Sequence, residues 1–120
     1  IAATDKLMGK AYSEAQAREM LAELSGKSHS VITGFSIIDT LEGKTVSQAV
    51  ETKVWFRKLS EEEIEAYVKS GEPIGKAGAY AIQGLGALIV ERIEGDYSNV
   101  VGLPLTALAE ALKEFGIPVL

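Results

Sequence analysis

The longest alternation of hydrophobic and polar positions lies in residues 45–57, TVSQAVETKVWFR. Such a two-residue period places successive side chains on opposite faces of a β-strand. One face carries Val46, Gln48, Val50, Thr52, Val54 and Phe56, and the other carries Ser47, Glu51, Lys53 and Arg57. A second strand is predicted over residues 30–39, SVITGFSIID, and the turn LEGK with Gly43 connects the two. Strands joined by so short a connection pair antiparallel, so the sequence predicts a long hairpin.

Hydrophobic residues recur every three or four positions in the segments that precede and follow this hairpin, which predicts helices. The first helix begins at Ser13, which has capping-box spacing to Gln16, and it ends at Gly26. The second has the sequence SEEEIEAYVKSG, in which Ser60 and Glu63 have the same spacing. Its three consecutive glutamates complement the positive end of the helix dipole, which is a better interpretation than a metal site.

A third helix is predicted after Pro104, and Gly116 and Pro118 end it. Its expected buried face consists of Leu105, Leu108, Ala109, Leu112 and Phe115. An apolar stretch over residues 87–93 predicts one more strand before this helix. Together these elements predict a single α+β domain over residues 1–120, with a mostly antiparallel sheet and helices packed against it.

The composition narrows the classes of function. The chain has no cysteine, so disulfides, thiolate metal sites and a cysteine nucleophile are excluded, and a reducing compartment is expected. A net charge of -5 argues against a nucleic-acid polymer as partner, and no apolar run is long enough for a membrane span. The single histidine, His29, is expected to be a solvated loop residue. The start IAATDKLMGK has no signal-peptide character and no initial methionine, which is typical of a fragment.

Charged residues of both signs could meet around phosphate groups. The cations considered are Lys10, Lys53, Arg57 and Lys76, and the carboxylates are Asp5, Glu42, Glu91, Glu94 and Asp96. Cleavage of a phosphoanhydride needs acids that hold a divalent ion and orient water, together with cations that offset phosphate charge. Each signal is weak alone, because charges on a solvent-facing sheet are usually only solvated, and Asp96 also suits a helix N-cap.

Gln83 lies in a segment rich in glycine and alanine, KAGAYAIQGLGA. Small residues allow a backbone to pass close to a flat ligand or to another strand. An amide side chain there could recognise the edge of a base, or it could simply hold a turn. The spacing alone favours the second interpretation.

Three segments resemble the Maf family of nucleoside triphosphate pyrophosphatases: residues 14–34, residues 59–73 (LSEEEIEAYVKSGEP) and residues 76–104 (KAGAYAIQGLGALIVERIEGDYSNVVGLP). The resemblance covers almost the whole chain. It implies an α/β fold of the inosine-triphosphatase-like kind, with an elongated mixed sheet. It also implies hydrolysis of a nucleoside triphosphate to its monophosphate and pyrophosphate, with a divalent metal (Mg or Mn), in the cytoplasm and as a homodimer.

The resemblance assigns roles to individual residues. Gln83 looks like the glutamine of the branch that acts on dTTP and UTP, and Lys10 and Lys76 look like lysines near the phosphates. Asp5 is the candidate for the catalytic carboxylate, with Thr4 as its neighbour at the substrate, although IAATD reverses the order of the family's alanine-aspartate-threonine motif. The family's N-terminal serine-proline-arginine-arginine motif is absent from this sequence. A nucleotide-binding or dimerisation module with impaired catalysis is therefore the alternative to an active enzyme.

Overall fold

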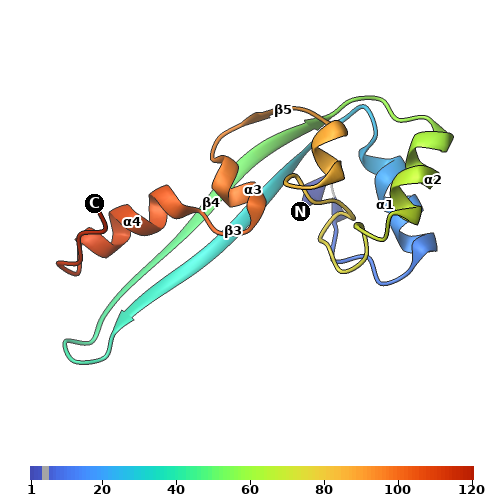
Figure 1. Cartoon of the computed structure of the whole chain (residues 1–120). Coiled ribbons are helices and arrows are strands. Elements are labelled where there is room, and N and C mark those ends of the chain that lie inside the picture. Colours follow the sequence, from blue (N-terminus) through green and yellow to red (C-terminus); the bar gives the residue numbers. More distant parts are fainter. Residues whose placement is uncertain (4–5) are drawn as a thin grey trace.

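The computed structural model of the chain describes residues 1–3 and 6–120 and has an elongated shape of 54 × 27 × 25 Å (Figure 1). Its strands are β1 (Ala2–Ala3), β2 (Lys6–Leu7), β3 (Ser28–Asp39), β4 (Lys44–Phe56) and β5 (Val90–Glu94). They form a sheet of order β2-β1-β3-β4-β5 in which neighbouring strands pair antiparallel. The helices are α1 (Glu14–Leu24), α2 (Glu61–Lys69), α3 (Tyr97–Val101), α4 (Leu105–Lys113) and the 3-10 helix η1 (Leu85–Leu88). The predicted α+β class with a largely antiparallel sheet is confirmed.

The β3–β4 hairpin consists of the two longest strands of the sheet and confirms the predicted alternation. Its register runs unbroken from Ser28 opposite Trp55 to Asp39 opposite Lys44. The even-numbered face of β4 is buried only near its end, at Thr52, Val54 and Phe56. Towards the turn this face is half-buried at Val50 and Val46 and exposed at Gln48, because α1 and α2 do not extend over it (Figure 1).

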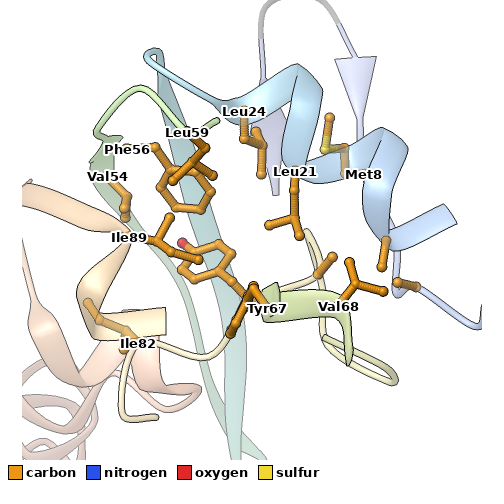
Figure 2. Packing of buried hydrophobic residues seen from close by; sticks show 14 residues of the cluster. Met8, Leu21, Leu24, Val54, Phe56, Leu59, Tyr67, Val68, Ile82 and Ile89 are labelled. Atoms are coloured by element: carbon orange, nitrogen blue, oxygen red, sulfur yellow. The ribbon is translucent and has the colours of Figure 1, made fainter. Parts of the chain in front are cut away.

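The hydrophobic core lies at the end of the hairpin remote from its turn, called the base below, where α1 and α2 pack (Figure 2). Leu21 and Leu24 of α1 and Val68 of α2 are fully buried, as the three- and four-residue spacing requires. The two helices are also joined by Arg18, whose Nε and Nη2 donate to the two carboxylate oxygens of Glu65 at 2.6 and 2.9 Å. The base of the hairpin is thus a packed two-layer unit.

Both predicted helix starts are confirmed, with one difference in detail. The capping box of α2 is complete, since the Ser60 hydroxyl accepts from the Glu63 amide and the Glu63 carboxylate accepts from the Ser60 amide. At α1 the Ser13 hydroxyl accepts from the backbone amide of Gln16. The Gln16 side chain, however, accepts from the backbone amide of Tyr12 and not from that of Ser13. The hydrogen bond from the Gln16 side chain thus goes to the residue before the N-cap, so the capping box at α1 is incomplete.

The predicted buried face of the last helix is wrong at Leu105, which is 57% exposed. Leu108, Ala109, Leu112 and Phe115 are half-buried, and the fully buried position of α4 is Ala111. The reason is tertiary: α4 lies beside the outer half of the hairpin, where its main contacts are with β3 and α3 (Figure 1). A helix in that position has no second layer to cover its apolar side.

The strand predicted over residues 87–93 begins later, at Val90, because Leu85–Leu88 forms η1 instead. The backbone amides of Leu85 and Gly86 donate to the Glu72 carboxylate at 2.9 Å each. Within the range predicted as a strand, the Ala87 amide donates to the Gly84 carbonyl at 3.1 Å and the Ile89 amide donates to the Gly86 carbonyl at 3.0 Å. Amides engaged in this turn are not available to a sheet. In the part of the chain that the structure describes, no helix has the length and apolar character needed to cross a bilayer.

Candidate functional site

A cavity of about 570 Å³ opens beside β3, between the segment 75–83 and the end of α3. A volume of this size is in the usual range for small-molecule sites. Its described lining consists of Ile1, Lys10, Val31, Ile32, Thr33, Gly75, Lys76, Ala77, Tyr80, Ala81, Ile82, Gln83, Asn99, Val100, Val101 and Gly102. The cavity therefore brings together Lys10, Lys76 and Gln83, which come from two distant parts of the sequence.

Backbone contact between two glycine-containing segments places the lysines at one wall of the cavity. The amide of Ala11 donates to the Lys76 carbonyl at 3.2 Å, and the Gly78 amide donates to the Gly9 carbonyl at 3.1 Å. Gly78 has a φ of 69°, which side-chain-bearing residues rarely adopt, and a Cβ there would displace the end of the Ile1 side chain, 2.6 Å away. The small residues here allow two backbones to run side by side.

The two lysines give this wall a positive charge. Neither ammonium group is in an ion pair with a carboxylate of the described residues, and the described lining contains no Asp or Glu. Glu72, which lies outside the lining, attracts Lys76 electrostatically but forms no ion pair with it. Cations in a concave site attract anions, and phosphate groups are typical ligands of lysine. The wall is suited to a phosphorylated ligand.

Gln83 lines the cavity from a loop that is held on both sides. Its side chain is exposed and makes no hydrogen bond within the described residues. The Ala81 amide, two residues before it, donates to the Tyr67 hydroxyl at 3.1 Å. The amides of Leu85 and Gly86, just after it, donate to Glu72, which also accepts from the Tyr67 hydroxyl. A fixed backbone with a free amide is an arrangement that can read hydrogen-bonding groups of a ligand.

The ionisation of Tyr67 and Glu72 supports these contacts. Burial, with the hydrogen bond to Glu72, raises the pKa of the Tyr67 phenol, so it remains a donor. Desolvation acts to raise the pKa of Glu72, but the hydrogen bonds from Tyr67, Leu85 and Gly86 outweigh it, and the net pKa is lowered. The pair is therefore a phenol and a carboxylate at neutral pH.

His29 is buried, and its prediction as a solvated loop residue is wrong. It is 3% exposed in β3, and its Nε2 lies 2.7 Å from the Tyr80 hydroxyl. The imidazole packs edge-on against Phe56 and Tyr80, with ring centroids 5.0 and 5.3 Å away. Burial, and then the positive N-terminus, lowers its pKa to about 4. Extending the alternation of β3 back by two residues from Val31 would have placed it on the inner face.

Asn99 is a buried residue of the cavity wall that the sequence pattern did not reveal. Its Nδ2 lies 3.0 Å from the Val31 carbonyl, 3.1 Å from the Val50 carbonyl and 3.1 Å from Thr52 Oγ1. This amide ties α3 to both strands of the hairpin, while its Oδ1 has no hydrogen-bond partner within the described residues. A single asparagine in the stretch YSNVV gives no signal of such a role.

Most other charges considered from the sequence lie away from the cavity. Arg57 pairs with Glu63 at 2.6 Å and donates to the Leu88 carbonyl at 2.7 Å, so it joins β4 to α2 and η1. Asp96 is the N-cap of α3, as its alternative interpretation predicted. The remaining three described acids, Glu42, Glu91 and Glu94, and the cation Lys53 are absent from the lining. These six groups therefore do not meet at the cavity, which is lined by Lys10 and Lys76 alone among the described charges considered, while Asp5 is not described.

Two predicted site residues, Thr4 and Asp5, lie outside the described residues. Within the described part of the chain, no group of three His, Asp or Glu side chains could hold a metal ion. Hard divalent cations prefer several oxygen ligands, and the described lining offers no carboxylate. The described residues alone do not fit a metal site.

Fold and cavity together define an elongated α+β protein with a cavity that has a cationic wall and an exposed amide. A family model described as Maf-like protein matches residues 1–115, and the chain belongs to this family. The match agrees with the KAGAYAIQG segment, which supplies both Lys76 and Gln83 to the cavity.

Curated relatives are similar over nearly the whole chain. A dTTP/UTP pyrophosphatase of Syntrophotalea carbinolica is 53% identical over 110 residues, covering 92% of this chain and 50% of the relative. A dTTP/UTP pyrophosphatase of a Thermoanaerobacter species (strain X514) is 54% identical over 117 residues, covering 97% and 61%. One of Bacillus cereus (strain AH820) is 52% identical, covering 95% and 59%. The chain thus spans about half to three fifths of the length of these relatives.

Proposed function

We propose that this chain provides the nucleotide site of a nucleoside triphosphate pyrophosphatase that acts on dTTP and UTP. The observation that carries the proposal is the cavity, in which two lysines and one free glutamine line the same space and the described lining has no carboxylate. The relatives named dTTP/UTP pyrophosphatase, about half identical over most of the chain, support the same substrate class.

In this proposal each side chain binds one part of the substrate. Lys10 and Lys76 bind the phosphates and offset their charge, while Gln83 donates to and accepts from the edge of the pyrimidine. Water attacks the linkage between the α and β phosphates, which releases the monophosphate and pyrophosphate. Asp5, with Thr4 beside it, is proposed as the carboxylate that accepts the proton of this water.

The proposal also includes a divalent cation, Mg²⁺ or Mn²⁺, a cytoplasmic location and a homodimer, all implied by the family resemblance. A bound cation would supply charge neutralisation to the phosphates. Since the described residues alone do not fit it, no step here depends on the metal. Pyrophosphate release in the presence of EDTA, then after adding back Mg²⁺ or Mn²⁺, measures the requirement, and light scattering measures the dimer.

The direct test is pyrophosphate release from dTTP, UTP and GTP by the chain, by three site variants and by one control variant. Lys10→Ala and Lys76→Ala should each lower kcat/KM by roughly 10- to 100-fold, because a charge-assisted contact is worth about 1.5–3 kcal/mol. Lys53→Ala, an exposed lysine of β4 outside the cavity, is the matched control and should leave it unchanged. Gln83→Glu should change the preference among the bases, and unchanged relative rates would remove Gln83 from base recognition.

A second candidate is a nucleotide-binding or dimerisation module without turnover. The absence of a carboxylate from the described lining favours it, because hydrolysis requires a base. This candidate predicts that UTP raises the melting temperature while no pyrophosphate appears. A plain structural domain would show neither effect.

A further inference from the structure

The loop of Gln83 is fixed by two side chains that do not line the cavity. Tyr67 lies near the end of α2 and Glu72 follows three residues after that helix, and neither belongs to the described cavity lining. Together they engage three backbone amides, those of Ala81, Leu85 and Gly86. The first amide comes two residues before Gln83 and the others come two and three residues after it.

Gly84 and Gly86, which flank Leu85, show that this loop packs closely against neighbouring atoms. A Cβ at Gly84 would collide with the Glu72 carboxylate, and a Cβ at Gly86 would collide with the Ala81 carbonyl. The backbone directly after Gln83 therefore has a position that only glycine permits at residues 84 and 86. The small residues of this segment are explained by the carboxylate behind the loop, as well as by the cavity in front of it.

The chemistry of the pair leaves little freedom for the loop. Oε2 of Glu72 accepts from both the Tyr67 hydroxyl and the Gly86 amide, and Oε1 accepts from the Leu85 amide. An ionised carboxylate accepts at both oxygens, and such charge-assisted hydrogen bonds are stronger than neutral ones. A glutamine in its place would turn an NH₂ group towards one of these donors.

We propose that Tyr67 and Glu72 are positioning residues for base selectivity, which hold the Gln83 amide where it meets the base without touching the ligand themselves. This inference rests on the function proposed above and goes beyond it, because it assigns selectivity to residues outside the cavity. Selectivity by hydrogen bonding requires a fixed partner, since a mobile amide can adapt to the wrong base.

The test is the ratio of kcat/KM for UTP to that for GTP in Tyr67→Phe and Glu72→Gln. Each variant should lower this ratio, by roughly 10-fold if one hydrogen bond to the base is lost. In a Gln83→Ala background the same substitutions should leave the ratio within about twofold, because the amide that they position is gone. Tyr97→Phe and Glu62→Gln make the same chemical changes at exposed positions and should not alter the ratio.

Two results would overturn the inference while the proposed function stands. One is an equal loss of kcat/KM on UTP and GTP, which would indicate a purely structural pair. The other is a ratio that still falls in the Gln83→Ala background. If Glu72→Gln does not fold, Tyr67→Phe decides, since it keeps the ring and removes only the hydroxyl. A parent chain that neither releases pyrophosphate nor gains thermal stability from UTP would overturn the proposed function, and this inference with it.

Discussion

The two ends of the β3–β4 hairpin have the same alternating sequence but different surroundings. At the base, Val54 and Phe56 are buried under α1 and α2, and the segment that carries Gln83 is anchored there (Figure 2). Towards the turn, Ile37 and Val46 of the same face are only half-buried, with only α4 alongside (Figure 1). Alternation of hydrophobic and polar residues therefore specifies a strand, whereas the stability of that strand comes from the layer of helices that covers it. We expect the global stability to reside at the base.

The strongest test removes one phenylalanine from each end. Phe56→Ala should lower the free energy of unfolding by about 3–5 kcal/mol, because it leaves a cavity in the core. Phe35→Ala, at a half-buried position of β3, should lower it by no more than about 1 kcal/mol. Urea denaturation followed by circular dichroism measures both. Equal losses would mean that the outer half contributes as much to the global stability as the base.

The second test uses the pH dependence of His29, which lies at the base. Its pKa is about 4 in the folded chain and 6.5 when unfolded, so between these values the unfolded chain binds more protons. The stability due to neutral His29 is complete above pH 6.5 and is lost as the pH falls towards 4, on the order of 3 kcal/mol.

Denaturation midpoints at pH 7, 5.5 and 4.5 measure this effect. The variant His29→Gln, which has no ionisable side chain at this position, is the comparison, because carboxylates titrate in part of the same range. The fall in stability between pH 7 and 4.5 should be clearly smaller in the variant. Parallel curves for the two proteins would contradict the burial of a neutral imidazole.

A third and smaller effect is expected at the helix caps of the base. Ser60→Ala removes the acceptor for the Glu63 amide in a complete capping box and should lower stability by about 1 kcal/mol. Ser13→Ala should have an effect of similar size, since the Gln16 amide loses its acceptor there. Thermal unfolding measures both, and threonine at either position should restore most of the loss.

The smallest effects concern the polar contacts that hold helices at each end. Arg18→Gln breaks the exposed pair with Glu65 between α1 and α2 and should lower global stability by about 0.2–1 kcal/mol. Lys44 donates to the Glu114 carbonyl at 2.7 Å and lies over the Phe115 ring at 5.0 Å, which fixes the end of α4.

Lys44→Ala should leave the midpoint of global unfolding unchanged but speed amide hydrogen exchange in α4, because that helix opens locally. Hydrogen exchange resolved by segment distinguishes the two variants. Uniformly faster exchange in Lys44→Ala would show that α4 and the base unfold as one unit.

Parts of the fold followed directly from local sequence. The hairpin, the caps at Ser13 and Ser60 and the ends of the helices depend on neighbouring residues, and the structure confirms them. Errors arose where a distant group decided the outcome. The loop that Glu72 holds turns into η1, which engages the amides of Ala87 and Ile89, so the expected strand starts later. The position of α4 leaves Leu105 exposed.

For the candidate site, the sequence by itself determined which residue types are available: two lysines beside glycines, one glutamine among small residues, and a resemblance that indicates nucleotide chemistry. Only the tertiary structure decided which of them share a cavity, since Lys10 and Lys76 meet through backbone contacts between separate segments. It also decided that Arg57 forms an ion pair with Glu63. Likewise, His29, Asn99 and Glu72 form hydrogen bonds with residues far away in the sequence. The physical reason is that periodicity records local geometry, whereas hydrogen bonds and burial between distant segments depend on how the chain folds back on itself.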